Sequence, residues 1–246
     1  MRARPGPGRL ADARRILCEA LELTSDPVQV SYLDRPPADV PARTTNAPSV
    51  CTFFADGRRR SFYADAPAHD DCEIGAFVYG RPAEGALGAR LQKTIGWMEQ
   101  IGYLAPGEAA SIPRLRSAPA YAAYGPLGSI DAPPSVVLLF AAPKSLMWVV
   151  EAHRRAWPTA PLPPLLGRPM CAVVPTVVND APLAVSVGCA GSRVYTGMSD
   201  HELVVAIRGD ALEPFVRALE TVRPANAEVT GENVRRKQAA RRTARR

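Results

Sequence analysis

The sequence lacks any apolar run long enough to cross a membrane. A membrane helix needs about 18–20 consecutive apolar residues, and no stretch of the 246 residues reaches that length. The N-terminal residues also lack the uninterrupted apolar region of a secretory signal. We therefore expect a cytoplasmic protein with no membrane span, in which cysteines stay reduced.

Several common functional motifs are missing as well. The sequence contains no Gly-x-Ser-x-Gly elbow, no P-loop and no His-Glu-x-x-His pair, so three frequent enzyme classes lose their usual support. It also has none of the Cys-x₂-Cys pairs that are typical of zinc knuckles. The sequence therefore leaves open whether the protein is an enzyme.

Basic residues are concentrated at one end of the chain. The net charge is +6, and residues 235–246 hold seven basic side chains and no acidic one, which leaves −1 for the rest. Nucleic acid is therefore an unlikely partner except through this tail. We expect a flexible N-terminus at residues 1–8, a single domain at 9–224 and a basic disordered tail at 225–246.

Hydrophobic periodicity and turn residues predict an α+β fold. Helices are expected from Arg9 to about Ser25, at 87–101, at 144–157, over a short stretch from Asp200, and at 211–222, where Pro224 closes the last one. Strands are expected at 28–33, 50–54, 61–63, 136–140, 170–174 and 183–187, and residues 106–126 are expected to form an irregular connection.

The two halves of the chain resemble each other weakly. Each contains a proline-led strand, then a first cysteine, then a second cysteine with a glycine eight positions later. These residues are Cys51, Cys72 and Gly80 in the first half and Cys171, Cys189 and Gly197 in the second. We interpret the pattern as two related β-rich halves, at about 26–104 and 133–222, with flanking helices and a pseudo-twofold arrangement that would bring the four cysteines together.

Cys51, Cys72, Cys171 and Cys189 are the candidate metal ligands. Thiolates bind soft and borderline metals, and four of them suit tetrahedral zinc or an iron–sulfur cluster. Their wide spacing favours a cluster, or an unusual site assembled by tertiary structure, over a zinc knuckle. Two alternatives stay open, since buried cysteines also pack as small hydrophobes or act as reactive thiols. Cys18 is expected to pack at the edge of the first helix.

The cysteines occur in an order of segments that is similar to a known family. The segments are Pro27-Val28, Cys51, Cys72-Glu73-Ile74-Gly75, Pro133-Pro134, Cys171, Gly188-Cys189-Ala190-Gly191-Ser192-Arg193 and Asp200-His201-Glu202-Leu203. Over roughly residues 10–222 the chain resembles the DUF169 family, and the Gly-Cys-x-Gly-x-Arg segment is the most specific piece. The family is uncharacterised, so the resemblance implies that the four cysteines and Arg193 are important and implies no activity.

Arg193 and three histidines are the remaining candidates. Arg193 is a candidate for binding an anionic substrate or neutralising an anionic cluster, and a surface ion pair with Asp200 or Glu202 is the competing interpretation. His69 precedes Cys72 by three residues and could replace a cysteine as ligand, but a solvated loop histidine is favoured. His153 and His201 adjoin charged residues and are expected at the surface.

Two functions follow from these residues. The first is a cysteine-ligated iron–sulfur or metal-binding protein, with zinc as the alternative metal, that has a redox or small-molecule enzymatic role of unknown reaction. The second is a non-catalytic module, zinc-stabilised or metal-free, that binds a ligand or partner. A small molecule or a redox partner would fit the first function, and the sequence does not determine the oligomeric state.

Overall fold

The computed structural model describes residues 7–43, 45 and 47–243. Most of the N-terminus that was expected to be flexible, residues 1–6, lies outside this range, and helix α1 begins at Pro7. No helix in the described part of the chain combines the length and the hydropathy of a membrane span.

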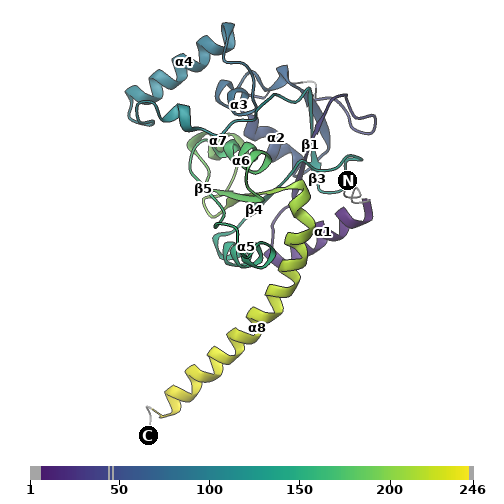
Figure 1. The fold of residues 1–246 in the computed structure, drawn as a ribbon, viewed down its shortest axis with the longest axis vertical. Helices are drawn as coiled ribbons and strands as arrows, with labels where there is room; N and C mark the ends of the chain where they lie inside the picture. The colour runs from purple at the N-terminus through teal and green to yellow at the C-terminus, as the bar shows by residue number, and fades with distance from the viewer. Residues whose placement is uncertain (1–6, 44, 46, 244–246) are drawn as a thin grey trace.

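The centre of the protein is a mixed β-sheet (Figure 1). Its strands are β1 (Val28–Leu33), β2 (Phe62–Asp65), β3 (Tyr121–Pro126), β4 (Val136–Ala141), β5 (Leu165–Leu166), β6 (Leu183–Ser186) and β7 (Leu203–Arg208), in the order β2-β3-β1-β4-β7-β6-β5. Neighbouring strands are antiparallel except for β5 and β6. With its accompanying helices, this sheet confirms the expected α+β class.

Hydrophobic side chains extend from both faces of the sheet. Every residue of β4 is buried, which is the pattern of a strand that is covered on both sides. Because side chains alternate along a strand, Leu138 packs into one core and Leu139 into the other. The sheet is therefore the middle layer of three.

Helices form the two outer layers. The first face packs against α2 (Val50–Gly57), the 3₁₀ turn η3 (Met170–Ala172) and α6 (Val173–Asn179), together with the neighbouring α3 (Glu73–Val78) and α7 (Ala190–Thr196). The second face packs against α1 (Pro7–Leu21), α5 (Pro143–Ala156) and the start of α8 (Leu212–Thr243). Helix α4 (Gly85–Gln100) projects beside α3 at the edge of the first layer (Figure 1).

The connections support the two related halves. In the first half, α2 follows β1 and α3 follows β2, and in the second half α6 precedes β6 and α7 follows it. The strand order β2-β3-β1 is mirrored by β6-β7-β4, with β1 and β4 side by side at the centre. Strand β3 extends the first half to Pro126, beyond the boundary near residue 104 that the sequence indicated.

Two segments that were predicted to be strands are helical. Residues 50–54 belong to α2, where Ser49 caps the helix by accepting a hydrogen bond from the backbone N–H of Cys51, 3.3 Å away. Residues 170–174 form η3 and the start of α6. Both runs are short and apolar, and such runs do not distinguish a buried helix from a buried strand.

Two further segments are strands, although the sequence predicted a helix close to one and an irregular connection for the other. Residues 203–208, near the helix expected from Asp200, form β7, which pairs with β4 on one side and β6 on the other. Residues 121–126, in the expected irregular connection, form β3 between β1 and β2. In both cases pairing with distant strands determines the structure, and local sequence does not report such pairing.

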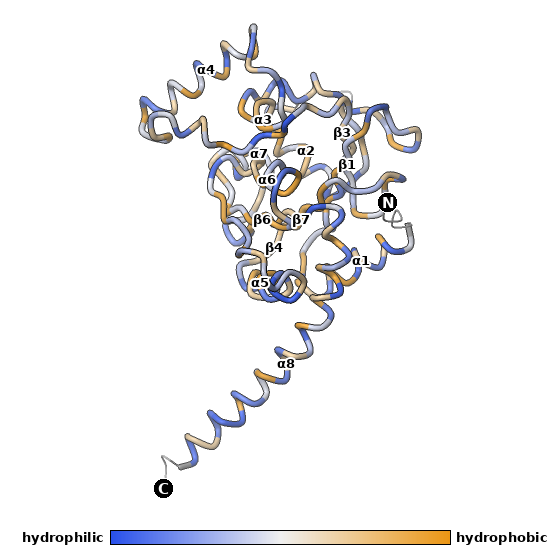
Figure 2. The backbone as a smooth tube through the Cα atoms, in the orientation of Figure 1, coloured by the Kyte–Doolittle hydropathy of each residue, from blue (hydrophilic) through white to orange (hydrophobic). Residues whose placement is uncertain are grey.

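Residues 225–243 of the basic tail are helical rather than disordered in the structure, and the last three residues of the predicted tail lie outside the described range. Helix α8 continues through Pro224 to Thr243 and projects away from the body as an arm (Figures 1 and 2). Two contacts fix its base: Arg223 donates to the backbone carbonyl of Glu19 at 2.8 Å, and Asn226 donates to Glu151 of α5. We define the arm as residues 227–243.

We predict that removing residues 227–246 leaves the stability of the body unchanged. The arm side chains whose exposure the structure describes are exposed or half-buried, and the deletion retains the contact of Asn226 with Glu151, which joins α8 to the body. Thermal unfolding should give a melting temperature within about 2 °C of the full chain. A fall of 5 °C or more would show that the arm packs on the body.

Candidate functional site

The four candidate cysteines lie at the starts of helical segments on one face of the sheet. Cys51 is in the first turn of α2, and Cys72 is the residue that caps the start of α3. Cys171 is in η3, directly before α6, and Cys189 caps the start of α7. Each half of the protein therefore supplies two cysteines.

All four cysteines line a single pocket of about 340 Å³. Cys51 and Cys171 are buried, and Cys72 and Cys189 are partly exposed. Apolar side chains form much of the remaining wall: Ile74, Met98, Tyr103, Leu104, Ile112 and Tyr195. Cys18 lies elsewhere, in a different hollow beside Asp26 and Arg58.

Backbone N–H groups point at two of the sulfurs. The N–H of Gly75 donates to Cys72 Sγ at 3.3 Å, and the N–H of Ser192 donates to Cys189 Sγ at 3.4 Å. Ser192 completes a capping box, because its hydroxyl accepts from the Cys189 N–H at 2.9 Å. Each sulfur thereby satisfies an N–H group in the first turn of a helix, where such groups have no partner within the helix.

Cys51 and Cys171 form a hydrogen-bonded pair across the two halves. The hydrogen bond from Cys171, followed by burial acting in the opposite direction, leaves the pKa of Cys51 below its ordinary value. The same hydrogen bond, reinforced by burial, raises the pKa of Cys171 well above its ordinary value. Burial also raises the pKa of Cys72. Cys51 is therefore the first of these three to become a thiolate.

The four sulfurs share a pocket without forming a closed metal site. Among the residues that the structure describes, no three His, Cys, Asp or Glu side chains are grouped so that they could hold a metal ion. The proximity of the four thiols is thus an observation, and their role as ligands stays a prediction.

Gly75 allows α3 to approach α2 closely. A Cβ atom at this position would lie 2.4 Å from Val50 Cγ2 and 2.9 Å from Cys72 Sγ, which are both shorter than any real contact. Only glycine therefore fits between the two helices that carry Cys51 and Cys72. This packing requirement explains why the Cys72-Glu73-Ile74-Gly75 segment ends in glycine.

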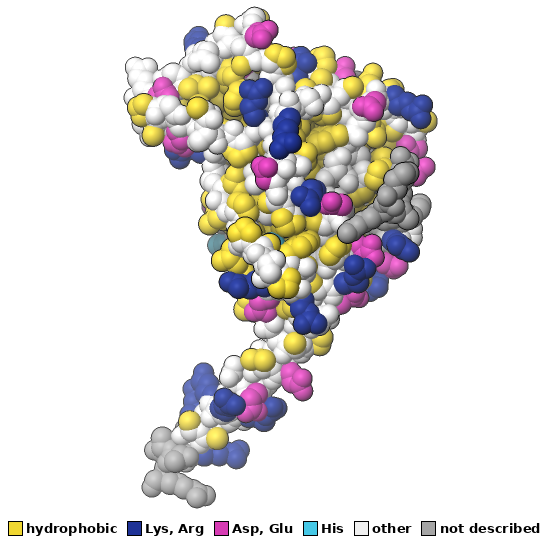
Figure 3. All heavy atoms as spheres, viewed as in Figure 1, with side chains coloured by type: hydrophobic (Ala, Val, Ile, Leu, Met, Phe, Trp, Pro, Cys, Tyr) yellow, Lys and Arg dark blue, Asp and Glu magenta, His cyan; other side chains and the backbone are white. Residues whose placement is uncertain are grey.

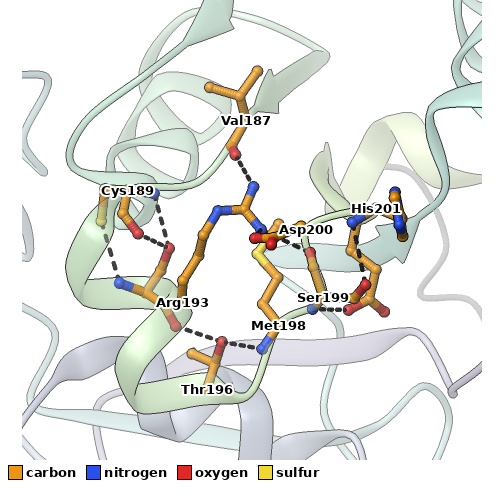
Figure 4. Close-up of polar contacts among 10 residues, drawn as sticks. Val187, Cys189, Arg193, Thr196, Met198, Ser199, Asp200 and His201 are labelled. Carbon is orange, nitrogen blue, oxygen red and sulfur yellow. Dashed lines mark hydrogen bonds and ion pairs between the residues drawn. The ribbon is translucent and has the colours of Figure 1, made fainter.

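Arg193 holds the loop on either side of Cys189 together (Figure 4). Its guanidinium donates to the Val187 carbonyl at 2.9 Å and to the Ser199 carbonyl at 2.7 Å, and it pairs with Asp200 at 3.3 Å. Arg193 is not among the residues that line the cysteine pocket. The structure gives Arg193 a positioning role, and anion binding by this residue stays an untested prediction.

The spacing of these residues matches a protein family. A family model described as DUF169, uncharacterised ArCR, matches residues 16–218. The chain belongs to the DUF169 family. Neither the search of curated proteins nor the search of solved structures returned a match. Membership confirms the resemblance that the cysteine segments indicated, and it assigns no activity to this DUF169 protein.

The structure corrects two of the three histidine predictions. His69 is buried rather than solvated, and its ring contacts the Asp65 carbonyl and the Tyr124 hydroxyl, at 2.9 and 2.8 Å. His69 does not line the cysteine pocket. His153 is also buried, against Trp157, whereas His201 is exposed as expected.

Two residues of the DUF169 site were not identified from the sequence. Arg168 lines the cysteine pocket, lies over the Tyr103 ring at 4.7 Å and pairs with Glu108 at 3.1 Å. Ser192 caps the helix that begins at Cys189. The position of Arg168, three residues before Cys171, and that of Ser192, three residues after Cys189, are signals that could have suggested them.

We predict that Arg193→Lys lowers stability by about 1 kcal/mol, because one ammonium cannot reproduce the fork that joins two carbonyls. Urea unfolding of the variant and the parent protein would measure the difference. Arg208→Lys, at an exposed pair with Asp210, is the matched control and should leave stability nearly unchanged. Equal effects of the two substitutions would contradict the positioning role.

We predict that His69 makes folding sensitive to acid. Burial lowers the pKa of His69 from 6.5 to about 4. Between these two pH values His69 is therefore neutral in the folded protein and protonated in the unfolded chain. Stability is then fully present above pH 6.5 and falls as the pH drops towards 4. Between pH 7 and 4.5 this histidine should account for about 2 kcal/mol of lost stability. Urea unfolding of His69→Gln should show a weaker pH dependence, and an unchanged dependence would refute the assignment.

Proposed function

We propose that this DUF169 protein binds an iron–sulfur cluster or a metal ion through Cys51, Cys72, Cys171 and Cys189 and uses it in redox or small-molecule chemistry. The observation that supports the proposal is that four thiols from two related halves line one pocket. Thiolates are the ligands of iron–sulfur clusters and of many zinc sites.

The wide sequence spacing of the four cysteines favours a cluster over a zinc knuckle, because such knuckles use Cys-x₂-Cys pairs. Four sulfurs bound to one ion lie about 4 Å apart, because each metal–sulfur bond measures about 2.3 Å. No group of three ligand side chains that could hold one ion exists among the described residues, so the thiols would rearrange on binding either a cluster or a single ion. Zinc is the alternative.

The protein's own residues would prepare the thiols for binding. Ligands must lose their protons before they bind a metal, and the hydrogen bond from Cys171 lowers the pKa of Cys51. The N–H groups of Gly75 and Ser192 donate to the sulfurs of Cys72 and Cys189, and they would orient these two sulfurs. The bound group would supply electron transfer or, with an open metal position, Lewis-acid catalysis.

The cysteine pocket as a whole has the dimensions of a small-molecule site. Its volume of about 340 Å³, the part lined by the cysteines included, lies within the range of ligand pockets, which are mostly apolar with a few placed polar groups. Arg168 is the cationic side chain in its wall, and Glu73 is an acidic one that accepts from Thr94 of α4. Reduced thiols also require a reducing compartment, which supports a cytoplasmic location.

The apolar wall favours a second candidate function. Without a metal, the same pocket would bind a small ligand between the two halves and the protein would be a non-catalytic module. Zinc could stabilise such a module without taking part in chemistry. Iron and sulfide content distinguishes this candidate from the first.

We predict that protein purified without oxygen is brown and contains stoichiometric iron and sulfide. Cys171→Ser should abolish most of the iron and lower the melting temperature of the loaded protein, because metal binding is coupled to folding. The control Cys18→Ser should retain both, since Cys18 lies outside the pocket. Colourless protein with one zinc would support the zinc module, and protein without stoichiometric metal would refute the proposal.

A further inference from the structure

The arm of α8 is the largest feature that the cysteine site does not explain. Helix α8 leaves the body after Asn226 and projects beyond it, and its described residues from 227 to 242 are exposed apart from Gly231 and Glu232, which are half-buried (Figure 3). With a rise of 1.5 Å per residue, the arm is about 25 Å long.

Positive charge surrounds the outer part of the arm. The described segment 235–242 contains five basic side chains and no acidic one: Arg235, Arg236, Lys237, Arg241 and Arg242. Successive residues are rotated by 100° around a helix, so these side chains point to all sides rather than forming one stripe. Arg235 and Arg236 both pair with Glu232 at the inner end of this segment, which supports the local helix by a few tenths of a kcal/mol.

The arm lacks the apolar surface by which a helix inserts into a membrane interface or packs on a second helix. An interfacial membrane helix requires one broad apolar face, and the large apolar side chains here are Val229 and Val234, which point about 140° apart. The same pair does not make the repeating apolar seam of a coiled coil. We therefore do not expect the arm to bind a partner by burying apolar side chains.

Double-stranded DNA matches the shape and charge of the arm. We propose that the arm is a docking surface for duplex DNA and binds it through the phosphate backbones. An α-helix with its side chains is about 10–12 Å wide and fits the major groove of about 12 Å, where basic groups on several sides reach both strands. The chain has no aromatic residue beyond Phe215, so the arm lacks the stacking groups that single strands require.

The arm should gain helical structure when it binds. Gly231 costs about 1 kcal/mol of helix stability relative to alanine, and a projecting helix of this length without tertiary packing is marginal in water. Neutralising its like charges with phosphates removes their mutual repulsion. Circular dichroism should therefore show increased helicity when duplex is added.

Fluorescence anisotropy with a labelled 20-base-pair DNA duplex tests the proposal on the full chain. Binding should weaken with salt, with a slope of log K against log salt concentration of about −4.5 to −6.3 for five to seven phosphate contacts. R241Q/R242Q should weaken binding at least tenfold and lower the slope by about two. The matched double variant R59Q/R60Q removes two adjacent charges from the body and should bind as the parent does.

Deletion of residues 227–246 should abolish binding while preserving the melting temperature and the metal content. Equal binding by R241Q/R242Q and the parent protein would overturn the proposal. It would also be overturned if vesicles with phosphatidylserine bound the chain and the duplex did not. Because the iron measurement uses the cysteine pocket alone, failure of the arm proposal and failure of the proposed function are distinguishable.

Discussion

The antiparallel pairing of β1 with β4 is the constraint on which the rest of the structure depends. It joins the two halves through only three aligned positions, Val28 with Leu138, Gln29 with Val137 and Val30 with Val136. Ser135 extends the junction, since its N–H donates to the Val30 carbonyl at 2.8 Å and its hydroxyl accepts from the Tyr32 N–H at 3.0 Å. Shifting this register by one residue would turn every side chain of β4 to the opposite core.

This junction decides where the cysteines meet. It places the helical segments of both halves on the same face of the sheet, and each segment begins with a cysteine near its first turn. The first N–H groups of a helix have no partner within the helix, so a sulfur at that position accepts hydrogen bonds, as Cys72 and Cys189 do. One arrangement of the backbone thus gathers the four thiols and supplies N–H donors to two of them.

The body and the arm differ in composition and charge. The body carries two hydrophobic cores and a net charge close to zero, whereas the last twelve residues carry seven of the positive charges. In the proposed docking, charge on a projecting helix would contact a polyanion away from both cores. The cysteine pocket and the arm can therefore be altered separately, and a change in one should leave the other intact.

The sequence by itself determined the cysteine set, the family and the elements with strong periodicity. Strand β1 was predicted at its observed bounds, and α5 within one residue at each end, because their patterns are local. Only tertiary structure decided that residues 50–54 and 170–174 are helical, since burial on all sides removes the periodicity that would distinguish them. Likewise, the buried contact of His69 with Tyr124 joins residues 55 positions apart. Such contacts depend on the order of the strands in the sheet, and the local sequence does not predict that order.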